Sequence, residues 1–584
     1  MKKPGAAPLW AILAFAAAFA AYSPTLRLGF VWDDHRMIEE NPRIRTWSAE
    51  NVRSWFRGDP FGQGLNYYRP LQTVSNAVDF RFWKLNPAGY HLTNLLFHSG
   101  GAAVSALALS SAGFPPAAAG GAALLLACHP TVVEQLIIIA GRAEVMAYFF
   151  TVLTVWLLAR PGPASFAGAL ASFILAMMSK ETGIIAPLLA LLLFYHRGTL
   201  RREWRRTLPF FLLIPLYLLL RRQALGGMPL TELGAAELAL RAAARLPADI
   251  FHYLAAAVAP LDLHSHRARP EPGAWPAALF GLALAGGLFA LARRGGRTAL
   301  FLAGWYLVNL APKVPLLLGN DLMLDHWVYG ANLALFLWFS SWLNASFSPR
   351  AGKAALAGAA LLLAAVGWLN ISRRGDDLKI YEHALPRTFS APLRYNLARE
   401  YFLRGDFARA EGLLEEILRR DPANAMYREG LAIARMNTGR AAEAAGMLAG
   451  AAAAGGYAPE TLLNLSLALE KAGDPRAAEA AARRLTSEFA DYPSGWKRLA
   501  DTRMKAGDGK EARSSLEKAL ALDPYDAETL GKLGAVEAGD ENYARAEELW
   551  RRALELDPGD VSLKKNLEKL DGLRRRSLPG DPRG

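Results

Sequence analysis

"PLWAILAFAAAFAAYSPTLRLGFVWDDH" (residues 8–35) is an apolar run that ends in two adjacent carboxylates. Its apolar part is long enough to cross the roughly 30 Å hydrocarbon core of a bilayer as a helix. The chain has 584 residues, of which 52% are apolar and 20% are charged, and this composition favours a membrane protein of more than one domain. Because Lys2 and Lys3 precede the run, a cleaved signal peptide is the alternative interpretation.

Further apolar runs predict a polytopic domain of about eleven membrane helices. The expected spans are 8–25, 91–112, 114–129, 133–159, 164–179, 182–196, 207–221, 274–292, 298–312, 326–346 and 353–371. Basic clusters at 197–206, 293–297 and 349–353 fall on one side of this map, together with Lys2 and Lys3. The positive-inside rule makes that side cytoplasmic. These clusters also explain the net charge of +13, so no nucleic-acid partner is expected.

The same map predicts which segments face the outside. For the count of crossings to agree, the amphipathic stretch 235–260 has to lie along the outer surface, or dip into the membrane and return. The outer segments are then the loop 26–90, the turns 129–134 and 180–182, the segment 313–325 and everything after residue 372. The chain has a single cysteine, Cys128, so no internal disulfide is expected.

A 34-residue period begins near residue 390 and predicts tetratricopeptide repeats, in which helix pairs stack into a solenoid with a concave groove. Five units are in register, at 391–424, 425–458, 459–492, 493–526 and 527–560. Turn glycines recur at Gly405, Gly439, Gly473 and Gly507. Small residues recur where paired helices must meet closely, at Ala410, Ala444, Ala478, Ala512 and Ala546.

The predicted fold class is therefore all-α, a polytopic membrane domain followed by an α-solenoid. We expect the membrane domain at 1–372, a linker at 373–390 and the repeats at 391–573, of which 561–573 form a capping helix. The last residues, 574–584, are expected to be a disordered tail. Charged residues of the repeats, such as Arg419 and Arg420, are interpreted as a solvated face.

Polar side chains beside membrane helices are costly, so they indicate function. On this map they gather at the outer edge from five segments of the chain. They are Asp33, Asp34 and His35; Tyr68 and Arg69; His91, Asn94 and His98; His129, Glu134, Arg142 and Glu144; and Lys180 and Glu181. Structural interpretations exist as well. His91 and Asn94 could cap a helix or form hydrogen bonds between helices, and the pairs Arg142 with Glu144 and Lys180 with Glu181 could be internal ion pairs.

Aromatic and basic residues alternate within the first outer loop, over 47–90. This pattern is typical of amphipathic helices that lie at the headgroup level of a membrane. Such helices would form one wall of a groove that is open to lipid. A substrate with a lipid tail and a phosphate head would fit there, with Arg142 or Lys180 binding its phosphate.

Several motifs resemble, in their order, the transmembrane and tetratricopeptide repeat O-mannosyltransferases and their bacterial relatives. They are "FVWDD" (30–34), "YYRPLQTVSNAVDF" (67–80), "PAGYHLTNLLFHSGGA" (87–102), "CHPTVVEQLIIIAGRAE" (128–144) and "SKETGIIAPLLALLLF" (179–194). "VAPLDL" (258–263) and "DHWVYGANLALF" (325–336) are similar to later motifs of that family in a weaker form, and His326 departs from the family pattern.

The resemblance implies a GT-C-type glycosyltransferase in a bacterial inner membrane. Such an enzyme transfers a sugar from a polyprenyl-phosphate donor, with inversion, to an acceptor on the extracytoplasmic face, here a protein Ser or Thr hydroxyl presented by the repeats. Asp33 and Asp34 match the acidic pair of the family's first outer loop, and which of them accepts the hydroxyl proton stays open. The candidate cations for the donor phosphate are Arg142, Lys180 and Arg69. The candidate substrate-binding residues are His91, Asn94, His129, Glu134, Glu144, Glu181 and Tyr68.

No cofactor is certain from the sequence. A divalent cation, Mg²⁺ or Mn²⁺, on Asp33, Asp34, His91 or Glu134 is one alternative, because carboxylate oxygens are hard ligands, whereas the resemblance implies a reaction without metal. Two other functions stay open. One is a non-catalytic membrane scaffold whose repeats recruit partners for envelope assembly, and the other is a ligase that transfers a whole lipid-linked glycan.

Overall fold

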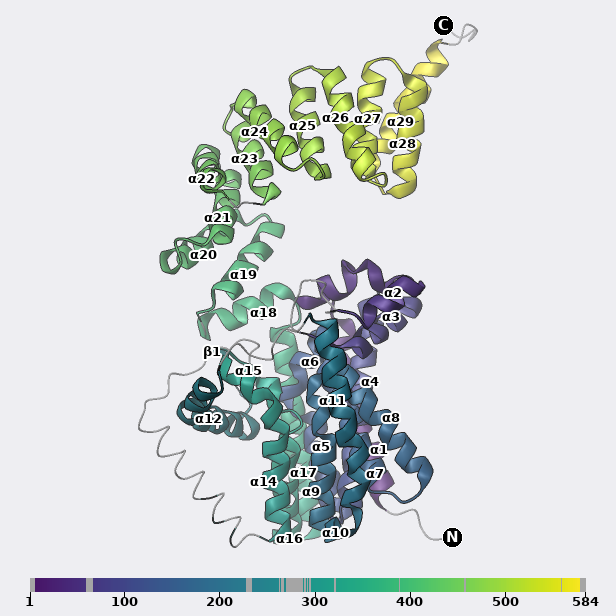
Figure 1. Cartoon of the computed structure of the whole chain (residues 1–584), viewed down its shortest axis with the longest axis vertical. Coiled ribbons are helices and arrows are strands. Elements are labelled where there is room, and N and C mark those ends of the chain that lie inside the picture. Colours follow the sequence, from purple (N-terminus) through teal and green to yellow (C-terminus); the bar gives the residue numbers. More distant parts are fainter. Residues whose placement is uncertain are drawn as a thin grey trace. The chain divides into compact units, whose positions relative to one another are not determined.

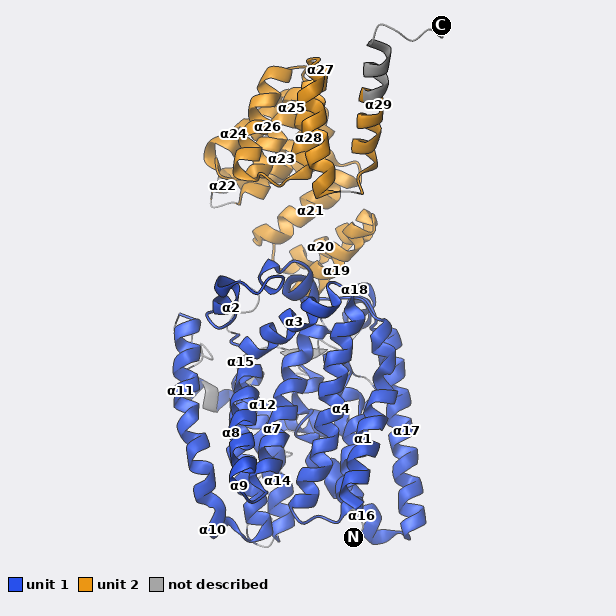
Figure 2. Ribbon diagram, turned by 90° about the vertical axis from the view of Figure 1, so that its right-hand side faces the viewer, with its two compact units in different colours: residues 1–390 blue, residues 391–584 orange. Residues whose placement is uncertain are grey.

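The computed structural model describes residues 6–58, 67–226, 234–261, 263, 267–268, 287, 290, 293, 296–319, 322–387, 389–455, 458–557 and 559–577. It divides into two compact units, Met1–Ser390 (unit 1) and Ala391–Gly584 (unit 2), coloured blue and orange in Figure 2. The described secondary structure is helical apart from one two-residue antiparallel pair, Arg267–Ala268 (β1) with Leu322–Met323 (β2). The predicted all-α class is confirmed.

Ten of the predicted spans fall on described residues, and each contains a helix. These helices are α1 (Ala6–Tyr22), α4 (Pro87–Ser111), α5 (Pro116–Cys128), α7 (Arg142–Leu158), α8 (Pro163–Ser179), α9 (Ala186–Arg197), α11 (Leu208–Ala224), α14 (Arg297–Leu310), α16 (Asn332–Ser346) and α17 (Pro349–Arg373). The segment predicted as one span at 133–159 is broken into α6 (Val133–Ile137), a 3-10 turn η5 (Ile139–Gly141) and α7. The span predicted at 274–292 lies almost wholly outside the described residues.

Fewer helices than eleven are long and apolar enough, by length and composition, to cross a membrane alone. Within the described ranges there are five, namely Ala6–Arg27, Pro87–Ser111, Ile139–Leu158, Arg297–Leu317 and Pro349–Arg373. A sixth is added if the pair Pro116–Cys128 and Pro130–Ile137, bent by 47°, forms one span. The chain is thus a membrane protein by composition, and the exact number of crossings stays a prediction.

Small residues bring the helices of unit 1 close together. Alanines of α1, α4 and α5, among them Ala14, Ala106 and Ala123, form one buried cluster. A Cβ atom on Gly120 of α5 would lie 2.2 Å from the ring of Trp10 on α1, so only glycine fits there. Because lipid tails are as apolar as a helix surface, close packing of this kind is what holds membrane helices together.

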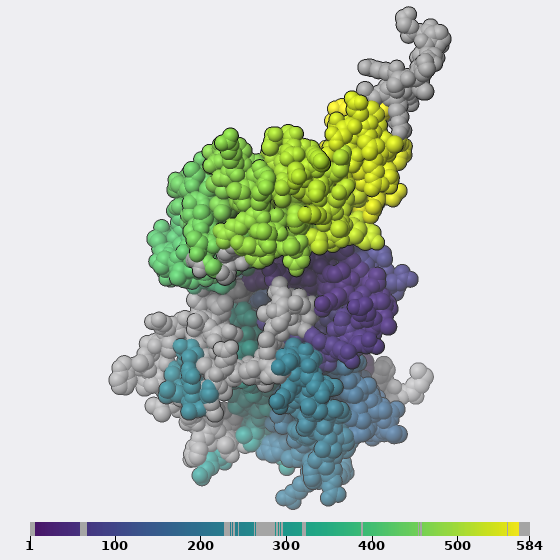
Figure 3. All heavy atoms as spheres, turned by 45° about the horizontal axis from the view of Figure 1, so that its top comes forward, coloured from purple at the N-terminus to yellow at the C-terminus, as the bar shows by residue number. Residues whose placement is uncertain are grey.

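The two ends of unit 1 carry different segments (Figures 1 and 2). The start of α1 and α10 (Leu200–Glu203) lie at one end, whereas α2 (Ala49–Trp55), α3 (Pro70–Trp83) and α18 (Asp377–Ala384) lie at the other. In the space-filling view of Figure 3, the purple segment with α2 and α3 forms part of the surface of unit 1.

The predicted basic clusters share the N-terminal end of unit 1. Gly198 packs against Arg297, and Trp10 and Lys353 line one small cavity. The first outer loop and the basic clusters therefore lie at opposite ends, as the map requires, while the side each end faces stays a prediction.

The remaining described helices of unit 1 lie after α11. They are α12 (Ala235–Val258) and the short α15 (Val314–Gly319). The amphipathic stretch 235–260 thus forms a helix as expected, and its place relative to a membrane stays a prediction.

Unit 2 consists of the predicted repeats (Figure 1). Its helices pair as α19 (Ala391–Leu403) with α20 (Phe407–Arg420), α21 (Ala425–Asn437) with α22 (Ala441–Ala454), α23 (Pro459–Lys471) with α24 (Pro475–Glu488), α25 (Pro493–Lys505) with α26 (Gly509–Leu522), and α27 (Ala527–Gly539) with α28 (Tyr543–Leu556). The five recurring alanines are completely buried. The close approach of paired helices that was inferred from them is confirmed.

The chain between the units differs from the prediction. Residues 373–390 were expected to be a linker, but they contain α18 and the 3-10 turn η10 (Leu385–Arg387), and both belong to unit 1. At the far end, α29 (Val561–Ser577) extends the predicted capping helix into the expected tail. The rest of that tail, 578–584, lies outside the described residues.

The turn between paired helices needs a left-handed residue. Gly405, Gly439, Gly473 and Gly507 have φ between +77° and +88°, whereas the fifth repeat places Glu541 there with φ +61°. Left-handed backbone costs a residue with a Cβ about 1–2 kcal/mol.

We therefore predict that Glu541→Gly raises the free energy of unfolding of the repeats by about 1 kcal/mol. Denaturant unfolding followed by far-ultraviolet circular dichroism measures this change. Glu541→Ala is the matched control, because it removes the carboxylate and keeps the Cβ, and it should give no gain. Equal stabilisation by both variants would contradict a backbone cause.

Candidate functional site

Asp34 is held by the backbone of a distant segment. Its side chain is completely buried. Oδ1 accepts the N–H of Ala140 at 2.7 Å, and Oδ2 accepts those of Ile139 and Val31, each at 3.1 Å. The donors at 139 and 140 are available because the helix is broken there into α6 and η5. Asp34 therefore ties the loop after α1 to this break.

The two carboxylates of the pair have different environments. Burial raises the pKa of Asp34 to about 7, although its three backbone N–H groups lower it. Asp33 is only half-buried, and among the described residues it has no hydrogen bond and no ion pair. Burial also raises the pKa of Asp33, while Arg69 and Arg36 act in the opposite direction. Asp33 is the carboxylate that is available to a ligand.

Arg142 was predicted to bind phosphate, but in the structure it is bound on all sides by the protein. Its guanidinium donates to Asn94 Oδ1 at 2.6 Å, Ser75 Oγ at 2.9 Å and the Tyr90 carbonyl at 2.9 Å, and it pairs with Asp79 at 2.6 Å. Arg142 is completely buried. This geometry corrects the expectation, because a fully engaged arginine holds helices together and has little left for a ligand.

Three further candidates also have structural surroundings. Asn94 donates to the carbonyls of Gln135 (3.0 Å) and Ile139 (3.2 Å). The ring nitrogens of His91 lie 2.9 Å and 3.2 Å from two carbonyl oxygens. His129 contacts Thr131 Oγ1 at 2.8 Å and the Ala257 carbonyl at 3.1 Å. All three are buried, so they position the backbone around the site, where direct substrate contact was expected.

A charged cluster lies at the ends of α7, α8 and α14, and only two of its three members, Glu144 and Lys180, were predicted from the sequence. Glu144 binds Lys180 through Oε2 and Lys313 through Oε1, each at 2.7 Å. All three side chains are at least nine-tenths buried. Lys313 was missed because "APKVP" carries no motif. Its signal is a lysine that ends a membrane helix, as Lys180 does.

Other candidates lie near this cluster. Arg69 approaches Glu181 at 3.9 Å and stacks over the ring of Tyr67 at 4.3 Å. Burial raises the pKa of Glu181, but Arg69 and Lys180 together lower it below its usual range, so these charges interact. The ring of Tyr68 lies 6.1 Å from that of Tyr217 on α11.

Glu134 and His326 form a pair, with Oε2 and Nδ1 separated by 3.3 Å. His326 interacts electrostatically with Glu144. The motif "DHWVYG" therefore does reach the site, although it departs from the family pattern.

The loop that carries the acidic pair is also fixed from α18. Trp32 has φ +55°, and its N–H donates to Asp377 Oδ1 at 2.7 Å. Asp377 Oδ2 lies 2.9 Å from His35 Nε2, and the other ring nitrogen of His35 bonds Glu39. Asp377 was missed because it falls in the stretch interpreted as a linker.

The divalent cation that the sequence left as an alternative finds no ligand set in the described part of the chain. No three His, Cys, Asp or Glu side chains lie together there as metal ligands would. The oxygens of Asp34 and the nitrogens of His91 already face backbone groups. We therefore assign no step to a metal.

An apolar groove opens between α5, α12, α16 and α17. Its volume is about 510 Å³, and its lining includes Leu125, Ala257, Phe336, Trp342 and Leu362. The carbonyl of Ala257 is the group that His129 contacts, so the groove begins beside the segment 129–134, which is predicted to be an outer one. Its size and lining suit a hydrocarbon chain.

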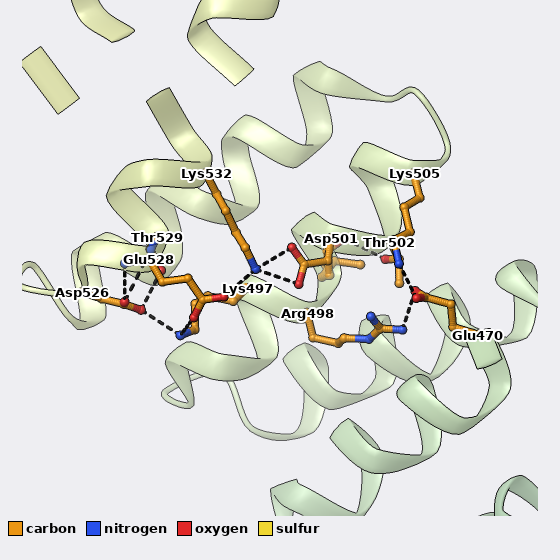
Figure 4. Close-up of polar contacts among 11 residues, drawn as sticks. Glu470, Lys497, Arg498, Asp501, Thr502, Lys505, Asp526, Glu528, Thr529 and Lys532 are labelled. Atoms are coloured by element: carbon orange, nitrogen blue, oxygen red, sulfur yellow. Dashed lines mark hydrogen bonds and ion pairs between the residues drawn. The ribbon is translucent and has the colours of Figure 1, made fainter. Parts of the chain in front are cut away.

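The repeats carry a network of paired charges on their first helices, α23, α25 and α27 (Figure 4). Lys497 pairs with Asp526 at 2.9 Å and with Glu528 at 3.1 Å. Lys532 bridges Asp501 and Glu528, each at 2.8 Å. No catalytic arrangement is evident in these pairs. The pair of Lys532 and Glu528 lies within α27, and the others join one repeat to the next.

Comparison with known proteins gives a family model for unit 2 and a set of similar proteins for part of the chain. The tetratricopeptide repeat family model matches residues 395–459, 463–527 and 497–561, so unit 2 contains tetratricopeptide repeats. It is similar to protein O-mannosyl-transferases: 34% identical to tmtc2 of Xenopus laevis over 149 residues, and 28% identical to TMTC3 of Homo sapiens over 137 residues. These matches cover 24% and 22% of this chain, and only 18% and 15% of the relatives.

Two solved structures resemble parts of the chain. One is TTC0263, a thermophilic TPR protein of Thermus thermophilus, with 18% identity and a TM-score of 0.28, covering 31% of this chain and 98% of that one. The other is YrrB, a TPR protein with an unusual peptide-binding site, with 21% identity and a TM-score of 0.25, covering 33% of this chain and 99% of that one.

The structural role of Arg142 gives a first prediction. Arg142→Met leaves Asp79 as an unpaired buried charge, so it should lower the free energy of unfolding by about 3–5 kcal/mol. Adding Asp79→Asn should restore most of the loss, because the pair is then removed as a whole. Thermal unfolding in detergent measures both variants, with Arg81→Met on the exposed face of α3 as control. Normal stability of Arg142→Met with weakened donor binding would restore the phosphate role.

The contact between His35 and Asp377 gives a pH-dependent prediction. The hydrogen bond to Asp377 is the main cause that raises the pKa of His35 to about 9. Because the folded pKa exceeds the unfolded value of about 6.5, the stabilisation is complete below pH 6.5 and is lost as the pH rises through 9. His35→Gln should therefore destabilise the protein more at pH 6 than at pH 10 in denaturant unfolding. An equal effect at both pH values would exclude the charged pair.

Proposed function

We propose that unit 1 is a glycosyltransferase that moves a sugar from a polyprenyl-phosphate donor to a protein Ser or Thr hydroxyl, with inversion. The observation that carries this proposal is Asp33, a half-buried carboxylate without a bonding partner among the described residues. Asp33 interacts electrostatically with Arg69, and Arg69 is linked through Glu181 to the cluster of buried lysines. The similarity to protein O-mannosyl-transferases supports the reaction class and suggests mannose as the sugar.

Asp33 serves as the general base in this proposal, and Asp34 positions it. The two oxygens of Asp34 are already engaged by three backbone N–H groups, which favour its charged form, so a proton on Asp34 would weaken these bonds. Asp33 takes the proton of the acceptor hydroxyl while its oxygen attacks the anomeric carbon. The bond between that carbon and the phosphate oxygen breaks, and the phosphate leaves with the electron pair.

The leaving phosphate needs positive charge. Lys180, Lys313 and Arg69 carry three positive charges, against the two carboxylates of Glu144 and Glu181, so the group has a net charge of about +1. A sugar phosphodiester has one negative charge and gains a second as its sugar leaves. Cations that are already oriented stabilise this developing charge without reorganisation. Lys313 thus replaces Arg142 among the proposed phosphate ligands.

Two observations favour a donor with a lipid tail. The groove between α5, α12, α16 and α17 is apolar and suits a polyprenyl tail. The segment with α2 and α3 exposes large aromatic side chains, including Trp47, Phe82 and Trp83, as helices at a headgroup interface do. The GT-C fold, the bacterial inner membrane and the extracytoplasmic face belong to this proposal, and so does the binding of the acceptor polypeptide by the repeats.

The test is transfer from polyprenyl-phosphate mannose to a Ser/Thr-containing polypeptide by the full chain in detergent. Asp33→Asn should lower the transfer rate 10²–10⁴-fold with little change in donor KM, because the base acts only in the transition state. Glu40→Gln, on an exposed side chain of the same loop, is the control and should be fully active.

Other outcomes assign other functions. Full activity of Asp33→Asn with an inactive, normally stable Asp34→Asn would reverse the two roles. A transferred group with the mass of a long glycan would indicate the ligase. Biological function that survives Asp33→Asn and is lost when the charge network of the repeats is disrupted would indicate the scaffold.

A further inference from the structure

Asp377 is a buried carboxylate outside the machinery described above. It lies at the start of α18, where the neighbouring Asp376 caps the helix by accepting the N–H of Lys379 at 2.9 Å. Asp377 itself points to the loop after α1 instead. One oxygen accepts the N–H of Trp32 at 2.7 Å, and the other lies 2.9 Å from His35 Nε2. A single carboxylate thus binds both flanks of the acidic pair.

Trp32 is the residue that needs this support. Its φ of +55° lies in the left-handed region, where a bulky residue is strained by about 1–2 kcal/mol. Such strain persists only where the surroundings determine the conformation. Here the N–H of Trp32 is fixed by Asp377, and its ring lies 5.4 Å from that of Tyr381, one turn further along α18.

The direction of Asp33 follows from this turn. Asp34 is anchored to η5 by two hydrogen bonds and accepts a third from Val31 of its own loop, so the conformation of Trp32 decides where Asp33 points. If Trp32 relaxes to an ordinary right-handed or extended conformation, the peptide between Trp32 and Asp33 rotates, and the Asp33 side chain rotates with it. The anchor on Asp34 alone does not prevent that rotation.

We propose that Asp377 is a positioning residue for Asp33: through Trp32 and His35 it holds the loop in the conformation in which Asp33 meets the acceptor hydroxyl. This inference rests on the proposed function for its catalytic consequence. The contact itself does not depend on that function. In sequence, α18 lies between α17 and the first helix of the repeats, α19, so a segment that was predicted to be a linker sets the geometry of the base.

The charge state of the contact fits this role. His35 lies between Asp377 and Glu39, and its pKa is raised to about 9, mainly by the hydrogen bond to Asp377. The imidazolium is therefore present at neutral pH and balances the buried carboxylate of Asp377. A neutral substitute of the same shape keeps the bond to Trp32 and loses this charge balance.

The experiment uses the full chain in detergent and three variants. Asp377→Ala removes both bonds, and Asp377→Asn keeps an oxygen that can accept the N–H of Trp32. Asp376→Ala is the matched control, because it removes the cap at the start of the same helix and leaves the carboxylate of Asp377 in place. Hydrogen–deuterium exchange with fragmentation reports the amide of Trp32, and the mannose-transfer assay reports kcat and donor KM.

We expect the Trp32 amide to exchange at least tenfold faster in Asp377→Ala, less fast in Asp377→Asn, and at the wild-type rate in Asp376→Ala. We expect kcat to fall about 10–100-fold in Asp377→Ala with donor KM unchanged, and to recover partly in Asp377→Asn. Unchanged exchange in Asp377→Ala, or equal effects of Asp376→Ala, would overturn the proposal. If the wild-type chain transfers no sugar, the proposed function fails, whereas the exchange result still decides whether Asp377 holds Trp32.

Discussion

The three backbone N–H groups that converge on Asp34 are the interaction on which the predicted outer end of unit 1 depends. Two of them are available because the helix over 133–158 is broken, which frees the N–H groups of residues 139 and 140; the third comes from Val31 of the same loop as Asp34. In a membrane, unpaired backbone groups of this kind need a partner, and the carboxylate of Asp34 supplies it. The loop after α1 is thereby fixed to η5, directly before α7, the helix that begins with Arg142 and contains Glu144 in its first turn.

Charge balance divides the polar residues of this end into two groups. The interior pair of Arg142 and Asp79 is neutral and holds α3, α4 and α7 together. The second group has three cations, Lys180, Lys313 and Arg69, against the two carboxylates of Glu144 and Glu181. A buried excess of positive charge is unfavourable unless an anion completes it. This imbalance supports a phosphate site beside Asp33.

Much of the architecture follows from the sequence, because it depends on local periodicity. The repeats have the predicted register, and their five small residues are completely buried. The helices on described residues lie where apolar runs predict them. Roles within the site are less accessible. The motif "AGRAE" does not show that Arg142 is fully engaged by the protein, or that the nearby Glu144 pairs with two lysines. Lys313 and Asp377 have no motif, because their importance comes from residues more than a hundred positions away.

The central claim is that the donor binds with its sugar at Asp33 and its phosphate among Arg69, Lys180 and Lys313. The most direct measurement is a structure of the full chain with a non-hydrolysable polyprenyl-phosphate sugar analogue. The account predicts an Asp33 oxygen on the face of the anomeric carbon opposite the phosphate, near enough for an acceptor hydroxyl to fit between them. It also predicts lysine ammonium groups in contact with the phosphate oxygens. Binding of the analogue at a place remote from Asp33, or with its phosphate on Arg142, would contradict the account.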